Sequence, residues 1–327
     1  MTKLELLVNP FGNLESEEPD DVQTPQFETD DAVEKAYNHY ISLRKRIWIY
    51  DRMWIYERIV PVLSPSQINI FFRRFDEDEI GRINFAVYSA RLIQESYDNG
   101  HNNFLIDVGD AEMTHFLQSA HGTLENPLKL TFCGNLEKYF ASSARYFEAH
   151  VKGNAGESCG SDSNNCVFNI EGNAPANCGY HAENSVFNIT GDASANCGAF
   201  SKKCNFNISG SSNDGLGEKA IDSKFKVAGD GGSGCGKSAE GCEFIVNGAL
   251  GNDLGLYAQD CFFYFERLTE YRMNYRSLGS IRFKETDSNS KFKTPNWETY
   301  KALKKESHLK NAKLRFDYMT WLKRKLK

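Results

Sequence analysis

The segment "GNAGESCGSDSNNCVFNIE" (residues 153–171) is followed directly by "GNAPANCGYHAENSVFNIT" (residues 172–190). The two segments have the same length, begin with glycine and end in V-F-N-I plus one polar residue. Glycine recurs at the same nineteen-residue interval at Gly134, Gly153, Gly172, Gly191, Gly210, Gly229 and Gly248. A fixed internal period of this size indicates a protein built from stacked repeats.

Each repeat closes with an alternating apolar pattern. Phe168 and Ile170 point one way, while Val167 and Asn169 point the other, which predicts a strand with one buried face. The rest of each unit is rich in Gly, Asn and Ser and suits tight turns. Because nineteen residues are too few for a strand, a helix and their connections, the sequence predicts a mainly β fold, a parallel, right-handed β-solenoid with 19-residue rungs.

The limits of the predicted solenoid are residues 101–266. Weaker copies of the pattern begin at Phe104, and the interval before Gly134 carries a six-residue insertion. Counting strands predicts about nine turns, and the pattern stops at Arg267, where the next glycine would fall. Stacking places equivalent residues about 4.8 Å apart, so we expect interior ladders of phenylalanine, of isoleucine and valine, and of cysteine.

Eight of the nine cysteines form two expected rows. One row is Cys159, Cys178, Cys197 and Cys235, and the other is Cys166, Cys204, Cys242 and Cys261. Thiolate ligands of zinc or an iron–sulfur cluster converge from short spacings, whereas these cysteines lie in lines. Ser185 and Ser223 also alternate with cysteine in the second row. We therefore expect small interior side chains, with no metal and no cofactor.

Two short motifs match catalytic patterns only by letter. The phosphate-loop match ends in Lys237 and Ser238, and "GESCG" around Ser158 matches a hydrolase elbow. Both motifs need a following helix, but here the repeat supplies a strand instead. The histidines are interpreted as isolated structural or solvent-facing residues, namely His115, His121, His150 and His181. No catalytic residue is predicted, and the chain is not expected to be an enzyme.

One outward column is the candidate partner-facing surface. It contains Asn169, Asn188, Asn207 and Lys226, and it becomes apolar further along at Ile245. This gradient is typical of a surface that another segment covers rather than of a catalytic groove. We therefore expect these residues to face a protein partner or a second copy of the chain.

The flanks divide into three predicted parts: an acidic N-terminal tail at 1–29, a helical cap at 30–100, and a loop plus a basic C-terminal helix at 267–327. A first helix is expected from Asp31 to about Pro61, and another is expected to begin at Ser64. A third places Phe85, Tyr88, Leu92 and Ser96 on one face and ends near Gly100. These helices are expected to pack over the first rung and hide its strand edge.

The composition and the charge of the chain limit the cellular compartment and the partners that can be expected. The chain of 327 residues has a formal net charge of −6, which gives no general reason to expect nucleic-acid binding. No secretory signal or membrane span is recognisable. A cytoplasmic protein with reduced thiols and no membrane partner is therefore expected.

The repeat resembles the GXGXG repeat domain. The likeness lies in Gly153-Asn154-Ala155-Gly156 with Gly160 and in the matching glycines of the next rungs, over about residues 104–266. That domain forms the C-terminal β-helix of the glutamate synthase large subunit and much of one of the subunits of formylmethanofuran dehydrogenase. The glycine pair that often precedes the strand in that family is here Asn165-Cys166 or Lys203-Cys204. The resemblance implies a structural domain that holds catalytic parts in place and carries no catalytic residue.

The function expected from these patterns is a non-catalytic scaffold that docks protein partners or assembles with copies of itself. Two alternatives remain open. One is an enzyme with a small-molecule or saccharide site at the junction of solenoid and helices. The other is a binder of polyanions or nucleic acid through the basic C-terminal helix.

Overall fold

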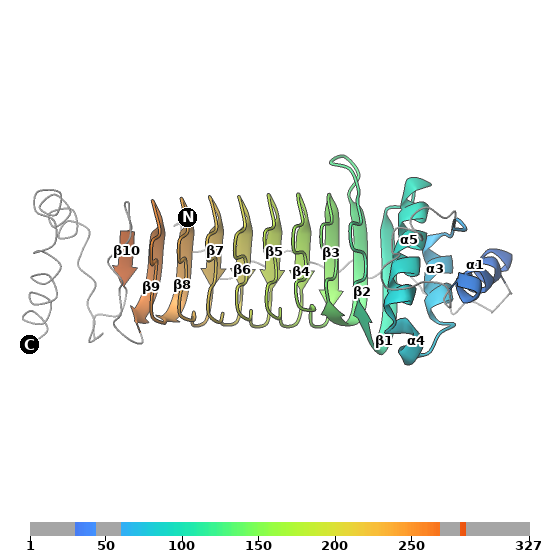
Figure 1. Ribbon diagram of the computed structural model, residues 1–327, viewed down its shortest axis with the longest axis horizontal. Coiled ribbons are helices and arrows are strands. Elements are labelled where there is room, and N and C mark those ends of the chain that lie inside the picture. Colours follow the sequence, from blue (N-terminus) through green and yellow to red (C-terminus); the bar gives the residue numbers. More distant parts are fainter. Residues whose placement is uncertain (1–29, 44–59, 269–281, 286–327) are drawn as a thin grey trace, which may run out of the picture. The chain divides into compact units, whose positions relative to one another are not determined.

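The structure, a computed structural model, describes residues 30–43, 60–268 and 282–285. Its centre is one sheet of ten parallel strands that follow one another in chain order (Figure 1). The strands are β1 (Asn103–Thr114), β2 (Leu128–Lys138), β3 (Phe147–Lys152), β4 (Val167–Ile170), β5 (Val186–Ile189), β6 (Asn205–Ile208), β7 (Lys224–Val227), β8 (Glu243–Leu250), β9 (Phe262–Leu268) and β10 (Arg282–Glu285). The predicted β-solenoid is confirmed with rungs of about 19 residues, and it has about 8 turns rather than the nine that were predicted.

A ladder of phenylalanine rings fills the interior behind β4–β9. Neighbouring rings lie 4.7–5.0 Å apart between centroids, with interplanar angles of only 2–10°. The six rings are fully buried and belong to Phe168, Phe187, Phe206, Phe225, Phe244 and Phe263. Ordinary sheets rotate by about 20–25° per strand, so near-parallel rings show that successive rungs here are stacked with little twist.

The glycine period follows from close contacts between rungs. A Cβ atom on Gly191 would lie 2.7 Å from the carbonyl oxygen of Gly172 in the preceding rung. Gly179 has a φ of +65°, and a Cβ there would lie 2.7 Å from the ring of Phe206. The first glycine of each rung therefore lets the backbones stack, and the second lets the phenylalanine ladder close.

Side chains also complete the backbone hydrogen bonding at the start of each rung. The N–H of Asn173 donates to Asn154 Oδ1 at 2.8 Å, and the N–H of Asp192 donates to Asn173 Oδ1 at 2.8 Å. The pattern continues as Ser211 N–H to Asp192 Oδ1 at 2.7 Å. Buried or constrained N–H groups need an acceptor, and here the Asn or Asp of one rung supplies it to the next.

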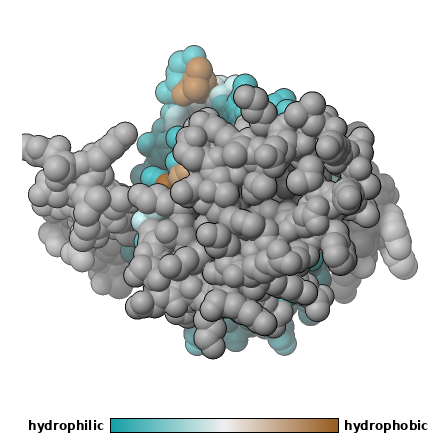
Figure 2. Space-filling view, turned by 90° about the vertical axis from the view of Figure 1, so that its left-hand side faces the viewer, coloured by the Kyte–Doolittle hydropathy of each residue, from teal (hydrophilic) through white to brown (hydrophobic). Residues whose placement is uncertain are grey.

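The first turn is longer than the others, as predicted, and its extra residues lie at two places. The register between β1 and β2 shifts between Asp107 and Glu112, and a loop projects at residues 121–127 (Figure 1). The loop is tied down where Tyr97 Oη donates to the Asn126 carbonyl at 2.6 Å. Leu124, in the middle of this loop, is 72% exposed. Figure 2 shows a projecting lobe that carries both hydrophobic and hydrophilic surface.

Four described helices precede the sheet, and three of them pack against β1. They are α1 (Asp31–Leu43), α3 (Pro65–Phe72), α4 (Glu77–Ile80) and α5 (Ile83–Asp98). The predicted start at Ser64 is confirmed, since its side chain accepts from the N–H of Gln67 and Gln67 returns the bond. The predicted face of the third helix is buried in α5, at Phe85, Tyr88, Leu92 and Ser96. The rings of Phe72 and Phe116 meet at 6.1 Å, so the cap covers the first rung.

The boundaries of the flanks differ in part from the predictions. The short α4 was not predicted, because four residues are too few to show a helical period. The described part of α1 reaches Leu43, and residues 44–59 of the expected first helix lie outside the described residues. The acidic tail at 1–29 and the basic helix expected near the C-terminus also lie outside them. No helix in the described part of the chain is long and apolar enough to cross a bilayer.

The end of the repeat lies later than predicted. The pattern was expected to stop at Arg267 and give way to a loop, but β10 pairs in parallel with β9 inside that segment. Phe283 lies opposite Phe263, one residue beyond the usual interval, and Arg267 stands where the next repeat glycine would fall. The prediction that the residues after 266 form only a loop until the C-terminal helix is therefore wrong at residues 282–285.

Candidate interaction face

The predicted partner-facing residues lie on the outward side of the sheet. Pairing in register places His150, Asn169, Asn188, Asn207, Lys226 and Ile245 in one line across β3–β8, here called the asparagine column. Two residues earlier in each strand, Lys129, Glu148, Val167, Val186, Asn205, Lys224 and Glu243 form a flanking column across β2–β8. Alternate residues of a strand share one face, so the two columns together form the outer face.

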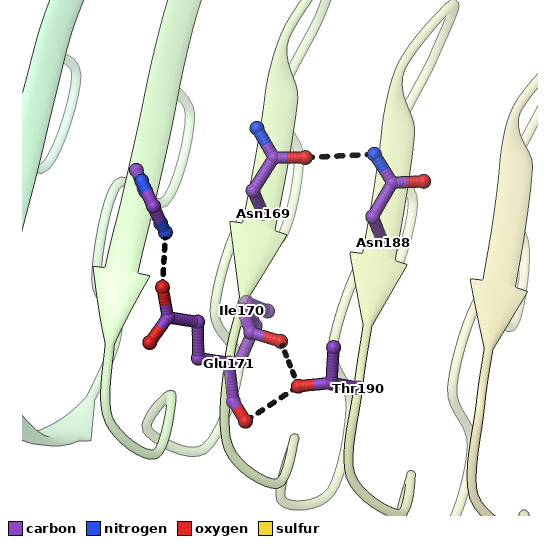
Figure 3. Close-up of polar contacts among 6 residues, drawn as sticks. Asn169, Ile170, Glu171, Asn188 and Thr190 are labelled. Atoms are coloured by element: carbon purple, nitrogen blue, oxygen red, sulfur yellow. Dashed lines mark hydrogen bonds and ion pairs between the residues drawn. The ribbon is translucent and has the colours of Figure 1, made fainter. Parts of the chain in front are cut away.

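The asparagine column is a hydrogen-bonded amide ladder. Asn188 Nδ2 donates to Asn169 Oδ1 at 2.7 Å (Figure 3), and Asn207 Nδ2 donates to Asn188 Oδ1 at 2.8 Å. These bonds fix the side-chain orientation. An amide carries two N–H groups and an oxygen with two lone pairs, so each ladder member keeps further capacity for hydrogen bonds to a partner.

The ladder is bordered by charged side chains at both ends of the outer face. On the β2–β3 side, Lys129 Nζ lies 3.2 Å from Glu148 Oε2. On the β7–β8 side, Lys224 Nζ lies 3.5 Å from Glu243 Oε2. Exposed pairs of this kind contribute about 0–1 kcal/mol each, so these charges can exchange partners at little cost. The centre between them, at Val167, Val186 and Asn205, is uncharged.

A further polar contact joins the asparagine column to the end of β4. His150 Nε2 lies 2.6 Å from Glu171 Oε1 (Figure 3). The Thr190 hydroxyl donates to the Ile170 carbonyl at 3.1 Å in the neighbouring rung. The border of the outer face next to Asn169 therefore carries a carboxylate.

The structure brings together the residues that the sequence singled out, but it adds others. Asn169, Asn188 and Asn207 contact one another, and Lys226 follows Asn207 in register. Glu148 and Lys224 were not predicted, because they lie in the flanking column. They could have been found from the same period, since Lys129 and Glu148, like Lys224 and Glu243, are nineteen residues apart.

The two cysteine rows are buried as predicted, but they differ in chemistry. The row of Cys159, Cys178, Cys197 and Cys235 also contains Leu216 and Leu254 at equivalent positions, which agrees with apolar filling. In the other row, Cys204 Sγ donates to the Ala182 carbonyl at 3.3 Å and accepts from the Ser185 N–H at 3.4 Å. Ser185 Oγ in turn accepts from the Cys166 N–H at 3.1 Å. The side chains of this second row therefore fill the interior as predicted, and their thiols and hydroxyls also take part in backbone hydrogen bonding, which was not predicted.

Burial disfavours the thiolate form in that second row. It raises the pKa of both Cys166 and Cys204 to about 11. Because the thiolate is the nucleophile and the metal ligand, these groups are neutral near pH 7. Among the residues that the structure describes, no group of three or more His, Cys, Asp or Glu side chains is placed to hold a metal ion.

The letter matches to catalytic motifs fall in turns. Lys237 Nζ lies 3.2 Å from Glu218 Oε1, and the next element is β8, as expected from the repeat. Ser158 is buried at a φ of +59° in a turn without a following helix. The interpretation of the histidines as isolated is wrong for His150 and His181, which lie 2.6 Å from Glu171 and 3.9 Å from Asp162. Both are solvent-facing, as predicted.

Comparison with known proteins finds no family model, no curated protein and no solved structure that matches this chain. The resemblance to the GXGXG repeat domain therefore stays a prediction from the residues quoted above.

Proposed function

We propose that this chain is a non-catalytic interaction scaffold whose outer face docks a protein partner. The observation that carries the proposal is the outer face itself, with an ordered amide ladder at its centre and charged side chains at both ends. A cytoplasmic setting, where the free thiols stay reduced, and the structural role implied by the GXGXG resemblance belong to the same proposal.

The geometry favours binding because much of the ordering is complete before a partner arrives. Immobilising a flexible side chain in an interface costs about 0.5–1.5 kcal/mol. Asn169, Asn188 and Asn207 are already held by their neighbours, so this cost is reduced for them. The flatness indicated by the phenylalanine ladder also suits face-to-face packing against another sheet, which aligns strands within about 30°.

The thiol and hydroxyl groups of the second cysteine row stabilise the fold by hydrogen bonding to the backbone. The thiol of Cys204 and the hydroxyl of Ser185 are engaged with backbone groups of adjacent rungs. This use of the side chains agrees with a structural protein. The alternative of polyanion binding depends on the basic segment after residue 290, which lies outside the described residues.

Cross-linking tests the proposal at defined positions. Lys226 lies on the outer face, whereas Lys202 belongs to a different line of bridges that joins Glu183 to Ile221. The native chain is expected to form partner cross-links from Lys226 but few from Lys202. Asn188→Arg places a charge in the amide ladder and should abolish them, while the control Glu183→Arg should leave them intact.

The opposite pattern would contradict the proposal. Partner cross-links that survive Asn188→Arg, or that disappear with Glu183→Arg, would show that another surface binds. Circular dichroism of both variants checks that the comparison is between folded proteins.

A further inference from the structure

We propose that the partner on the outer face is a second copy of this chain, docked face to face around a two-fold axis that runs along β5. This inference rests on the proposed function, because it names the partner of the same face.

A two-fold axis parallel to the strands reverses the order of the rungs in the second copy. With the axis at β5, that strand meets itself, β4 meets β6, β3 meets β7 and β2 meets β8. In the asparagine column, Asn188 then lies opposite its own copy and Asn169 lies opposite Asn207. Amide ladders of two paired sheets pack closely in this way in dry sheet interfaces. The spare N–H and carbonyl groups of each ladder find partners in the other.

The flanking column becomes complementary in charge under the same operation. Glu148 on β3 lies opposite Lys224 of the second copy on β7. Lys129 on β2 lies opposite Glu243 on β8. Since Lys129–Glu148 and Lys224–Glu243 are ion pairs within each chain, docking joins them into two four-membered networks of alternating charge.

The asparagine column agrees with this arrangement at its charged end. Lys226 of one copy lies opposite His150 of the other, and the His150 ring contacts the Glu171 carboxylate at 2.6 Å. The Lys226 cation therefore lies near the Glu171 carboxylate. A two-fold axis parallel to the direction in which the rungs stack would instead place each rung opposite the same rung of the second copy. Lys224 and Lys226 of one chain would then lie against the same lysines of the other. Like charges at an interface are costly, so the axis along β5 is favoured.

The size of the face sets the expected affinity. Seven strands at about 4.8 Å spacing and four residues at about 3.3 Å give roughly 400 Å² of sheet per copy. Stable interfaces bury about 800 Å² per partner. We therefore expect a weak dimer with a dissociation constant in the micromolar range, and weaker binding at high salt, where exposed charges are screened.

Charge reversal with complementation tests the arrangement. Sedimentation equilibrium of the native full-length chain should show a mass that rises from 37.0 kDa toward twice that value with concentration. Glu148→Lys and Lys224→Glu each reverse both symmetry-related contacts and should weaken the dimer about tenfold or more. An equimolar mixture of the two variants should recover dimerisation to within about threefold of the native chain. In the mixed dimer, one contact is native and the other is the reversed pair.

The matched controls are Glu183→Lys and Lys202→Glu, which reverse one acid and one base that are both exposed and lie off the outer face. Neither should change the dissociation constant. Glu148→Gln, which removes the charge without reversing it, should weaken the dimer less than Glu148→Lys and serves if the reversal disturbs folding.

Three results would overturn the inference: a native chain that stays monomeric at several hundred micromolar, reversal variants that dimerise like the native chain, or a mixture that stays monomeric. If the chain is monomeric and Asn188→Arg still abolishes cross-links to another protein, the self-pairing fails while the proposed scaffold function stands.

Discussion

Replacing Cys204 tests whether the side chains of the second cysteine row only fill space or also accept hydrogen bonds from the backbone. Its thiol accepts from the Ser185 N–H at 3.4 Å, and its one S–H group lies within reach of the carbonyls of Ala182 and Lys202. Both carbonyls keep a backbone donor, from the N–H of Lys202 and of Asn184, when the thiol is removed. The loss is therefore concentrated on one buried N–H group. An unsatisfied buried donor costs about 1–3 kcal/mol.

The expected order of stability at this position is Cys204→Ser close to the native chain, then Cys204→Ala lower by about 1–3 kcal/mol in the free energy of unfolding. Serine keeps the acceptor, as Ser185 and Ser223 already do in this row, whereas alanine does not. Urea unfolding followed by circular dichroism measures the order. Comparing midpoints avoids the assumption that a repeat protein unfolds in one step.

Cys235 is the matched control, because it lies in the row that also holds Leu216 and Leu254. There the order should invert, since a buried hydroxyl in an apolar row is penalised and Cys235→Ser should be less stable than Cys235→Ala. If serine is the worse replacement at both positions, the thiols of both rows only fill space and the hydrogen-bonding role of Cys204 is refuted.

Three further changes follow from the same rungs. Gly191→Ala should lower the free energy of unfolding by about 1–3 kcal/mol, because its Cβ would lie 2.7 Å from the Gly172 carbonyl oxygen. A urea midpoint equal to that of the native chain would contradict this close contact. Ser163→Ala should be neutral or stabilising by up to about 1 kcal/mol in the same assay, because the buried Ser163 hydroxyl has no hydrogen-bond partner within the described residues. A clear loss of stability would show that this hydroxyl does make a stabilising hydrogen bond. The melting temperature should stay constant up to about pH 9 and fall between pH 9 and 11. The folded-state pKa of Cys166 and Cys204 is raised from 9.0 to about 11, so the unfolded chain releases these protons first as the pH rises. Equal melting temperatures at pH 8 and 10.5 would contradict this prediction.

The repeat could be predicted because it leaves a direct trace in the sequence. Glycine at one interval and the alternation of Phe168 with Asn169 predict both the strand and its register. Identical rungs repeat the same contacts, so the local pattern and the tertiary structure carry the same information. The capping Ser64 and the buried face of α5 were predictable for the same reason, since caps and helical spacing are local.

The remaining features depend on contacts between rungs or on departures from the period. β10 was missed because Phe283 follows Phe263 by twenty residues and because Arg267 stands where the next repeat glycine would fall. The hydrogen-bonding role of Cys204 depends on a backbone N–H in another rung, which no single rung displays. The charged borders of the outer face could have been predicted from the sequence, but only by comparing the flanking column with the asparagine column at the same nineteen-residue interval.

The in-register stack can be measured directly by pulsed electron spin resonance distances between labels on one outward line of the solenoid. Asn164, Glu183 and Gln259 lie on one line of bridges, separate from the outer face, with Glu183 one rung and Gln259 five rungs after Asn164. Labels introduced there through noncanonical residues, with the protein diluted in unlabelled chain, report distances within one copy. The separation of positions 164 and 259 should be about 24 Å for five rungs, and moving the first label to position 183 should shorten it by about 4.8 Å. A distance that stays the same or lengthens after that move would contradict the stacking of rungs at nineteen-residue intervals.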